Sequence, residues 1–250
     1  MERPVALISG AARGIGLATA RLLSVRGWKV AMLDRDGEEL RTAADGVENG
    51  RAFVCDVSDP EAVGAAIAEA EDTFGRLDAL VNNAGVAEFG PIEATDFACW
   101  RRVMATNLDG VFLLSQAATP ALKASKGVIV NIASISGLRA STLRVAYGTS
   151  KAAVIQLTKQ QAVELGEFGI RANCICPGPV RTKLAMAVHT NDIIDAYHDA
   201  IPLNRYGSES EIAEAITFLC SPSASYVTGQ VLAADGGFEA AGVGLPALRR

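Results

Sequence analysis

Three residues between positions 134 and 151 have the types and spacing needed to move a proton to or from an alcohol. Tyr147 and Lys151 stand four residues apart, so a helix would place both side chains on one face, one turn apart. A phenol has an ordinary pKa of about 10, and a nearby ammonium lowers that pKa because it stabilises the phenolate. Ser134 ends an apolar segment thirteen residues before the tyrosine and would hydrogen-bond a substrate oxygen. The three residues predict general acid–base catalysis, although Tyr-x-x-x-Lys also arises by chance on plain helix surfaces.

A glycine-rich turn follows the first apolar segment of the chain. Gly10, Gly14 and Gly16 permit a tight turn and let backbone N–H groups approach a pyrophosphate. The spacing is G-x-x-x-G-x-G rather than G-x-G-x-x-G, so the prediction of dinucleotide binding rests on the mechanism. Asp34 follows Gly16 by eighteen residues, where a carboxylate accepts from the adenosine ribose hydroxyls. The alternative is a plain strand-to-helix turn with a solvated aspartate.

Composition limits the classes of protein that the chain can represent. It has 250 residues, half of them apolar, which suffices for one large α/β domain or two small ones. The net charge is -5 and no basic block stands out, so nucleic acid is not an expected partner. The chain shows no signal peptide and no apolar run near 18 residues in length, so we expect a soluble, cytoplasmic protein and no membrane partner.

The cysteines and histidines do not suggest a metal site. The five cysteines are scattered, and Cys174 and Cys176 would share one face of a strand, a geometry unsuited to a disulfide. We therefore expect reduced thiols, mostly in the core. His189 and His198 are the only histidines and have no cysteine close by in the sequence, so no metal is predicted.

Strand and helix patterns alternate along the chain. Apolar segments predict strands at 5–9, 28–33, 52–57, 77–85, 127–134, 170–178 and 230–237. Helices are predicted at 14–26, 38–44, 60–74, 96–122 (interrupted near Pro120), 146–167 and 210–220, with a loop-rich region at 179–206. Strands that are apolar throughout indicate a parallel sheet covered on both faces. The predicted fold is α/β, a doubly wound, Rossmann-like parallel sheet of seven strands in a single domain, residues 1–250.

With these residues in view, the chain resembles the short-chain dehydrogenase/reductase family over nearly its whole length. Besides the glycine turn, Asp56 and the Ser134, Tyr147 and Lys151 set, three groups of residues carry the resemblance. They are Asn82-Asn83-Ala84-Gly85 with Asn107, Pro177-Gly178-Pro179-Val180-Arg181-Thr182, and Tyr226 to Gln230 with Asp235-Gly236-Gly237.

The resemblance implies a role for each matching residue. Tyr147 would be the general acid/base, Lys151 would lower its pKa and bind the nicotinamide ribose, and Ser134 would hold the substrate oxygen. Asn107 would kink its helix and anchor a water that relays protons to Lys151. Residues expected to contact the cofactor are Gly10, Arg13, Gly14, Ile15, Gly16, Asp34, Arg35, Asp56, Val57, Asn83, Ala84, Gly85, Tyr147, Lys151, Pro177, Gly178, Val180 and Thr182.

The resemblance predicts an oxidoreductase that interconverts a small secondary alcohol and its ketone. NAD is the expected cofactor because the Asp34 carboxylate would repel a 2′-phosphate, although Arg13 and Arg35 could grip one. The alternatives are an NADPH-dependent 3-oxoacyl thioester reductase and a non-catalytic nucleotide-binding protein. Apolar residues beyond one stripe in the helices around 107–122 and 146–167 predict an interface, and the resemblance adds a homotetramer and a substrate lid at 183–205. The tail at 239–250 looks loosely held from its sequence.

Arg144, three residues before Tyr147, is the candidate for substrate selectivity. By the resemblance, the residues between the serine and the tyrosine line the substrate side of the cleft, and Arg139 lies there as well. A guanidinium there could bind a carboxylate bidentately or meet the hydroxyls of a neutral polyol. The plain alternative is that Arg144 pairs with a nearby carboxylate or faces water. The predicted substrate-binding residues are Ser134, Arg144 and Tyr147.

Overall fold

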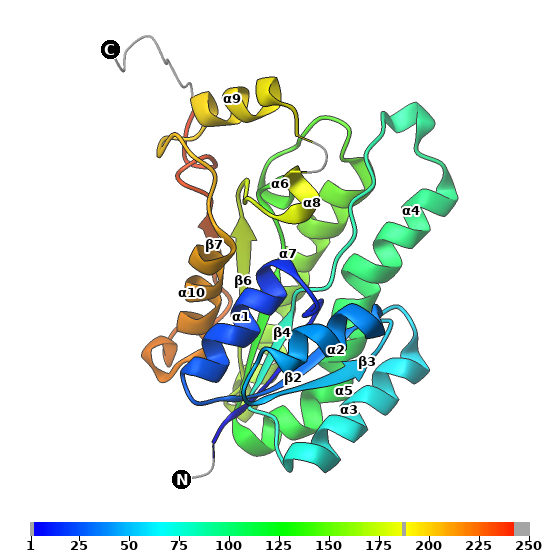
Figure 1. Cartoon of the computed structure of the whole chain (residues 1–250), viewed down its shortest axis with the longest axis vertical. Helices are drawn as coiled ribbons and strands as arrows, with labels where there is room; N and C mark the ends of the chain where they lie inside the picture. The colour runs from blue at the N-terminus through cyan, green and yellow to red at the C-terminus, as the bar shows by residue number, and fades with distance from the viewer. Residues whose placement is uncertain (1–2, 187–188, 243–250) are drawn as a thin grey trace.

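The computed structural model describes residues 3–186 and 189–242 and contains one seven-stranded parallel sheet (Figure 1). The strands are β1 (Val5–Ser9), β2 (Lys29–Asp34), β3 (Gly50–Val54), β4 (Ala79–Asn82), β5 (Val128–Ile132), β6 (Arg171–Pro177) and β7 (Val231–Ala234). Their order in the sheet is β3-β2-β1-β4-β5-β6-β7. The order reverses between β1 and β4, so a crevice opens there at the carboxyl ends of the strands. The predicted doubly wound, Rossmann-like fold is confirmed.

Helices cover both faces of the sheet. They are α1 (Gly14–Val25), α2 (Gly37–Asp45), α3 (Pro60–Phe74), α4 (Phe97–Met104), α5 (Gly110–Ser125), α6 (Ile135–Leu138), α7 (Val145–Leu165), α8 (Lys183–Met186), α9 (Asn191–Ala200) and α10 (Glu209–Cys220). Helices α1 and α10 pack side by side on one face, and α3 and α5 on the other (Figure 1). No helix in the described part of the chain is long and apolar enough to cross a membrane.

The apolar strands result from this two-sided cover. In β1, Ala6 and Ile8 join the core beneath α1 and α10, whereas Val5 and Leu7 join the core beneath α3 and α5. All four side chains are at most 1% exposed. A strand buried on both faces favours apolar residues at successive positions, so its sequence reads as a nearly continuous apolar run.

The structure corrects the predicted interruption near Pro120. Helix α5 runs through Pro120 to Ser125, and the break instead lies between α4 and α5, where Ala105–Asp109 forms a π-helical turn. Asn107 lies in that turn with its side chain fully buried. A polar side chain that bonds outside its own helix can distort the backbone there. A proline removes one N–H, and packing of the surrounding helix outweighs that loss at Pro120.

The region 179–206, predicted to be loop-rich, contains two helices. Thr190 caps α9 by accepting a hydrogen bond from the Ile193 N–H (3.4 Å), and the short α8 precedes it. Both helices lie at the end of the molecule toward which β6 points (Figure 1). The segment has few buried apolar residues, so the pattern that predicted the other helices is weak here. In the predicted tail, residues 243–250 lie outside the described part of the chain.

Candidate active site

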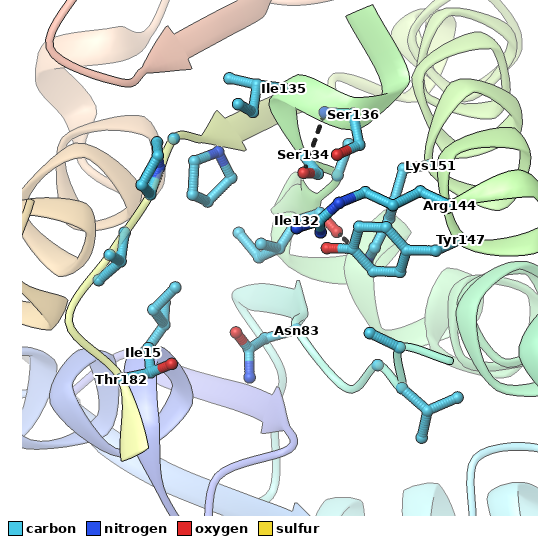
Figure 2. A pocket seen from close by; sticks show the side chains of 18 of the residues that line it. Ile15, Asn83, Ile132, Ser134, Ile135, Ser136, Arg144, Tyr147, Lys151 and Thr182 are labelled. Carbon is cyan, nitrogen blue, oxygen red and sulfur yellow. Dashed lines mark hydrogen bonds between the residues drawn. The ribbon is translucent and has the colours of Figure 1, made fainter. Parts of the chain in front are cut away.

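The end of β5 lies next to the start of α7. This arrangement brings Ser134, Tyr147 and Lys151 together. Ser134 follows β5 and caps α6, its Oγ accepting from the Ser136 N–H at 3.1 Å. Tyr147 and Lys151 lie in the first two turns of α7. Gly137 allows α6 to pack directly on α7, since an added Cβ would lie 2.7–2.8 Å from the backbone of Lys151 and Ala152. Figure 2 shows the tyrosine phenol and the serine hydroxyl directed into one pocket.

Burial dominates the electrostatics of the tyrosine. It raises the pKa of Tyr147 above its ordinary value of 10, while a hydrogen bond with Ser134 and the charge of Arg144 lower it. Lys151 directs its Nζ to the Ile132 carbonyl oxygen at 2.8 Å and lies 5.8 Å from the centre of the tyrosine ring. Burial is thus the largest effect on the pKa of Tyr147, and the expected lowering of that pKa by Lys151 stays a prediction.

Lys151 itself is strongly affected by its surroundings. Its side chain is 4% exposed and lies above the sheet near Cys174 and Cys176. Burial lowers its pKa from 10.5 to about 8, against a smaller opposing effect of the two thiols. An ionisable group with its pKa moved this close to neutrality, at the edge of a pocket, is typical of a catalytic site.

Asn107 connects the π-helical turn to the loop after β4. Its Oδ1 accepts from the Val86 N–H (2.8 Å), and its Nδ2 donates to the Val86 carbonyl (2.9 Å) and to Ser150 Oγ (3.0 Å). The predicted kink is present, and the amide fixes the loop against α7 one residue before Lys151. The predicted proton-relay water stays a prediction. Asn107 itself does not line the pocket.

The glycine turn is built for close backbone contact. A Cβ on Gly16 would lie 2.1 Å from the Gly10 carbonyl oxygen, and one on Gly10 would lie 2.9 Å from the Ala84 Cα. Asn83 locks the turn to β4, with its Nδ2 donating to the Ser9 and Gly10 carbonyls at 3.0 Å each. Helix α1 has no side-chain cap and no acidic residue in its first turn, which leaves its N-terminal N–H groups available to an anion.

Two cavities meet at this turn. One has a volume of about 640 Å³ and lies over the glycine turn, Asp34, Arg35, Asp56 and Val57. The other, about 240 Å³, contains Ser134, Arg144, Tyr147 and Lys151, together with Pro177 to Val180. They share six lining residues, Ile15, Asn83, Gly85, Val86, Ala87 and Thr182. Nearly every predicted site residue lines one cavity or the other; Gly16 and Asn107 instead support the walls from behind.

The charged residues around the larger cavity fall into separate pairs. Asp34 accepts from the N–H groups of Ala12 (3.2 Å) and Asp36 (3.1 Å), which fixes its carboxylate at the rim. Arg13 pairs with Asp36 at 2.7 Å and with Glu39 at 2.5 Å. Arg35 is exposed, and its charge together with the Ser58 hydrogen bonds holds the pKa of Asp56 below its ordinary value, with the Ser58 bonds the larger cause.

The two arginines predicted near the substrate behave differently. Arg139 turns away from the pocket, where it donates to the carbonyls of Phe238 (2.7 Å) and Ala241 (3.3 Å). Arg144 lines the smaller cavity, with its guanidinium carbon 4.7 Å from the Phe89 ring centre and 5.9 Å from that of Tyr147. Within the described residues Arg144 has no carboxylate partner, so the plain alternative of an internal ion pair does not hold.

Several lining residues were not among the predicted site residues. Hydrophobic walls come from Val86, Phe89 and Ile135, whose sequence positions show no distinctive signal. His189 and Tyr197, in the segment predicted to cover the substrate, also line the smaller cavity. Gly137 could have been found from the sequence, since a glycine directly after Ser134-Ile135-Ser136 indicates close packing.

Comparison with known proteins decides the family. A family model described as Enoyl-(Acyl carrier protein) reductase matches residues 10–239. The chain belongs to the short-chain dehydrogenase/reductase family. It is therefore an oxidoreductase that uses a nicotinamide cofactor, as predicted.

Three similar proteins are named for different substrates. The chain is 42% identical to a trans-4-hydroxycyclohexanecarboxylate dehydrogenase of Sinomonas cyclohexanicum, over 95% of this chain and 93% of the relative. It is 41% identical to a galactitol 2-dehydrogenase (L-tagatose-forming) of Cereibacter sphaeroides, over 95% and 96% of the two chains. A crystal structure of a 3-ketoacyl-(acyl-carrier-protein) reductase from Brucella melitensis, complexed with NADH, superposes with a TM-score of 0.91 at 33% identity, over 95% and 99%.

Proposed function

We propose that this short-chain dehydrogenase/reductase interconverts a small secondary alcohol and its ketone with NAD, and that its substrate carries an acidic group. The observation that supports the reaction is the convergence of Ser134, Tyr147 and Lys151 in the smaller cavity, which shares part of its wall with the larger one. A site next to the larger cavity would receive the reacting end of a dinucleotide, while the smaller cavity would receive the substrate.

The residues around the larger cavity fit a dinucleotide. The glycine turn and the uncapped start of α1 would hold the pyrophosphate, Asp34 the adenosine ribose, and Asp56 and Val57 the adenine. Lys151 would hold the nicotinamide ribose. The residues that follow β6, from Pro177 to Thr182, would contact the nicotinamide end. When bound, the nicotinamide accepts a hydride from the alcohol carbon or delivers one to the ketone.

Proton transfer would be carried by the protein's own side chains. In oxidation, the Tyr147 phenolate takes the hydroxyl proton as the carbinol hydrogen leaves as hydride; in reduction, the phenol returns a proton to the carbonyl oxygen. The Ser134 hydroxyl accepts from a backbone N–H, so its own hydrogen, directed to Tyr147 in this structure, would pass to the substrate oxygen when substrate binds. Lys151 would supply positive charge when the phenolate forms, and Asn107 would hold the adjoining loop and the relay water in place.

NAD is preferred over NADP on the charges beside the ribose site. The carboxylate of Asp34 is fixed by two backbone N–H groups, so a 2′-phosphate would meet a stationary negative charge. Arg13 is already engaged by Asp36 and Glu39. Of these two arginines only Arg35 is left to attract a phosphate, and it is exposed to solvent, where its contribution is screened.

The lining of the smaller cavity favours an acidic substrate over a polyol. Its described lining contains no Asp or Glu and has apolar walls, and it includes the guanidinium of Arg144, which has no carboxylate partner among the described residues. A polyol needs hydrogen-bond acceptors as well as donors, whereas a carboxylate on an apolar ring needs only donors and a dry wall. This combination matches the kind of alcohol named for the Sinomonas cyclohexanicum relative better than galactitol.

The remaining proposals concern assembly, motion and location. Val163 on α7 and Phe112 on α5 are 79% and 48% exposed, and the edge strand β7 exposes Leu232 at 42%. Apolar surface on these elements supports a homotetramer with two-fold axes. Residues 183–205 would act as a lid that closes over substrate, and a cytoplasmic location is proposed for the assembled enzyme.

A kinetic comparison tests the substrate proposal. The probes are trans-4-hydroxycyclohexanecarboxylate, its neutral carboxamide and galactitol, each assayed with NAD and NADP by the absorbance of the reduced nicotinamide. We expect the carboxylate to have the highest kcat/KM, and Arg144→Ala to raise its KM by about tenfold or more with little change in kcat. Higher kcat/KM for galactitol, or an unchanged KM in Arg144→Ala, would contradict the acidic-substrate proposal.

A further inference from the structure

His189 and Tyr206 form a hydrogen-bonded pair at the wall of the smaller cavity. The Nδ1 of His189 lies 3.0 Å from the Tyr206 hydroxyl oxygen, and the two rings meet edge to face at 5.9 Å. The imidazole also stacks on Tyr197 at 5.5 Å. His189 and Tyr197 line the same cavity as Arg144.

The scaffold beneath the pair is rigid. Tyr206 is 4% exposed, and the next residue, Gly207, pairs with the strand-like segment after β6. There Gly207 N–H donates to the Pro179 carbonyl and its own carbonyl accepts from Arg181 N–H, both at 3.0 Å. The tyrosine hydroxyl therefore has a fixed position relative to the residues that follow β6.

Hydrogen-bond accounting then assigns the tautomer of His189. In the described part of the chain, the only partner of the buried Tyr206 hydroxyl is His189 Nδ1, so the hydroxyl proton has nowhere else to go. With the hydroxyl as donor, its buried hydrogen is satisfied, Nδ1 accepts, and the ring proton is placed on Nε2. Burial, and after it the charge of Arg144, lowers the pKa of His189, which keeps the ring neutral at pH 7. Nε2–H has no partner among the described residues.

We propose that His189 is a second specificity-determining residue: its Nε2–H, oriented by Tyr206, donates a hydrogen bond to the acidic group that Arg144 also binds. The inference rests on the proposed function, since it requires an acidic substrate in the smaller cavity. Arg144 lies at the start of α7, and His189 lies in the segment before α9. An acidic group bound by both side chains would therefore connect α7 to the segment 183–205. A carboxylate has two oxygens and can accept from both donors at once.

The test asks whether His189 donates a hydrogen bond to the substrate or only packs against its neighbours. The wild type, His189→Leu and His189→Gln are assayed on trans-4-hydroxycyclohexanecarboxylate and on its carboxamide, with NAD titrated in each preparation to confirm an intact cofactor site. His189→Leu should raise KM for the carboxylate by about tenfold and for the carboxamide by less than about twofold, with kcat nearly unchanged. His189→Gln, whose amide places an N–H near the same position, should restore KM to within about threefold of the wild type.

Tyr206 is tested as a positioning residue with a double-mutant cycle. Tyr206→Phe keeps the buried ring and removes the hydroxyl, so it should raise KM for the carboxylate about threefold in the wild type and leave it unchanged when His189 is already leucine. An equal rise of KM on both probes in His189→Leu, or no rise on either, would overturn the inference. A wild type that prefers the carboxylate through Arg144 yet ignores His189 would overturn this inference alone, whereas a wild type without that preference would overturn the proposed function itself.

Discussion

The burial of Lys151 gives the sharpest prediction about stability, because a buried ammonium should lower the free energy of unfolding. Its pKa falls from 10.5 to about 8 on folding, a difference of about 2.5 pH units. At ~1.36 kcal/mol per unit, the buried ammonium lowers the free energy of unfolding by about 3 kcal/mol at pH 7. Replacing it with Met removes that penalty but also loses the hydrogen bond to the Ile132 carbonyl, worth about 1 kcal/mol.

We therefore expect Lys151→Met to be more stable than the wild type by about 1–2 kcal/mol at pH 7, while losing turnover. For a domain of this size the midpoint of thermal unfolding should rise by about 3–6 °C. The difference should shrink as pH rises from 8 toward 10.5, because the folded protein releases the Lys151 proton there while the unfolded chain keeps it, so the wild type gains stability.

Urea denaturation at pH 7 and at pH 9.5, at one protein concentration and without cofactor, measures the effect. Lys159→Met is the matched control, since Lys159 lies on the same helix two turns further along and is exposed. Its change should stay within about 0.5 kcal/mol. The reasoning that burial of the charge dominates would be refuted by two results together. Lys151→Met would be less stable than the wild type at pH 7, and the difference in their free energies of unfolding would be the same at pH 9.5.

Three further predictions follow from the same site. Because burial raises the pKa of Tyr147, kcat/KM for alcohol oxidation should increase with pH through the alkaline range, while kcat/KM for ketone reduction should stay constant until that range. Arg144→Ala should move both pH profiles to higher pH, because the charge of Arg144 lowers the pKa of Tyr147. Identical profiles for this variant and the wild type would contradict the prediction. Asp34→Ser should raise kcat/KM with NADP relative to NAD by about tenfold or more, and an unchanged ratio would show that the carboxylate does not select the cofactor. Light scattering at micromolar concentration should give a tetramer, and Val163→Glu should break it; a wild-type species of 26 kDa would refute assembly.

The sheet was predictable from the sequence because its five central strands, β2, β1, β4, β5 and β6, are buried on both faces. β1 shows why: its first four residues, Val5 to Ile8, are all apolar, and the turn after the strand concentrates three glycines within seven residues. Seven apolar segments separated by helical patterns then allow few topologies. The residues that end these strands, including Ser134 and Asp34, lie where the carboxyl edge of a parallel sheet must place them.

The features that could not be predicted depend on contacts distant in sequence. The resemblance predicted a kink at Asn107, but its form as a π-helical turn depends on the bonds of Asn107 to Val86 and Ser150, which lie 21 and 43 residues away. Pro120 carries a strong local signal, yet packing overrides it. The pKa of Tyr147 depends on burial, and the orientation of the Lys151 ammonium depends on the Ile132 carbonyl, which no spacing rule identifies.

The measurement that tests the central claim most directly is made on Tyr147→Phe. The substitution removes only the hydroxyl, so the ring and the Lys151 side chain beside it are kept. Titrating NADH binding and measuring turnover in one preparation, we expect cofactor affinity close to that of the wild type and a turnover at least ~10²-fold lower, since a general acid/base has been lost. If Tyr147→Phe keeps more than about a tenth of the wild-type rate, proton transfer does not depend on this hydroxyl and the proposed mechanism is wrong.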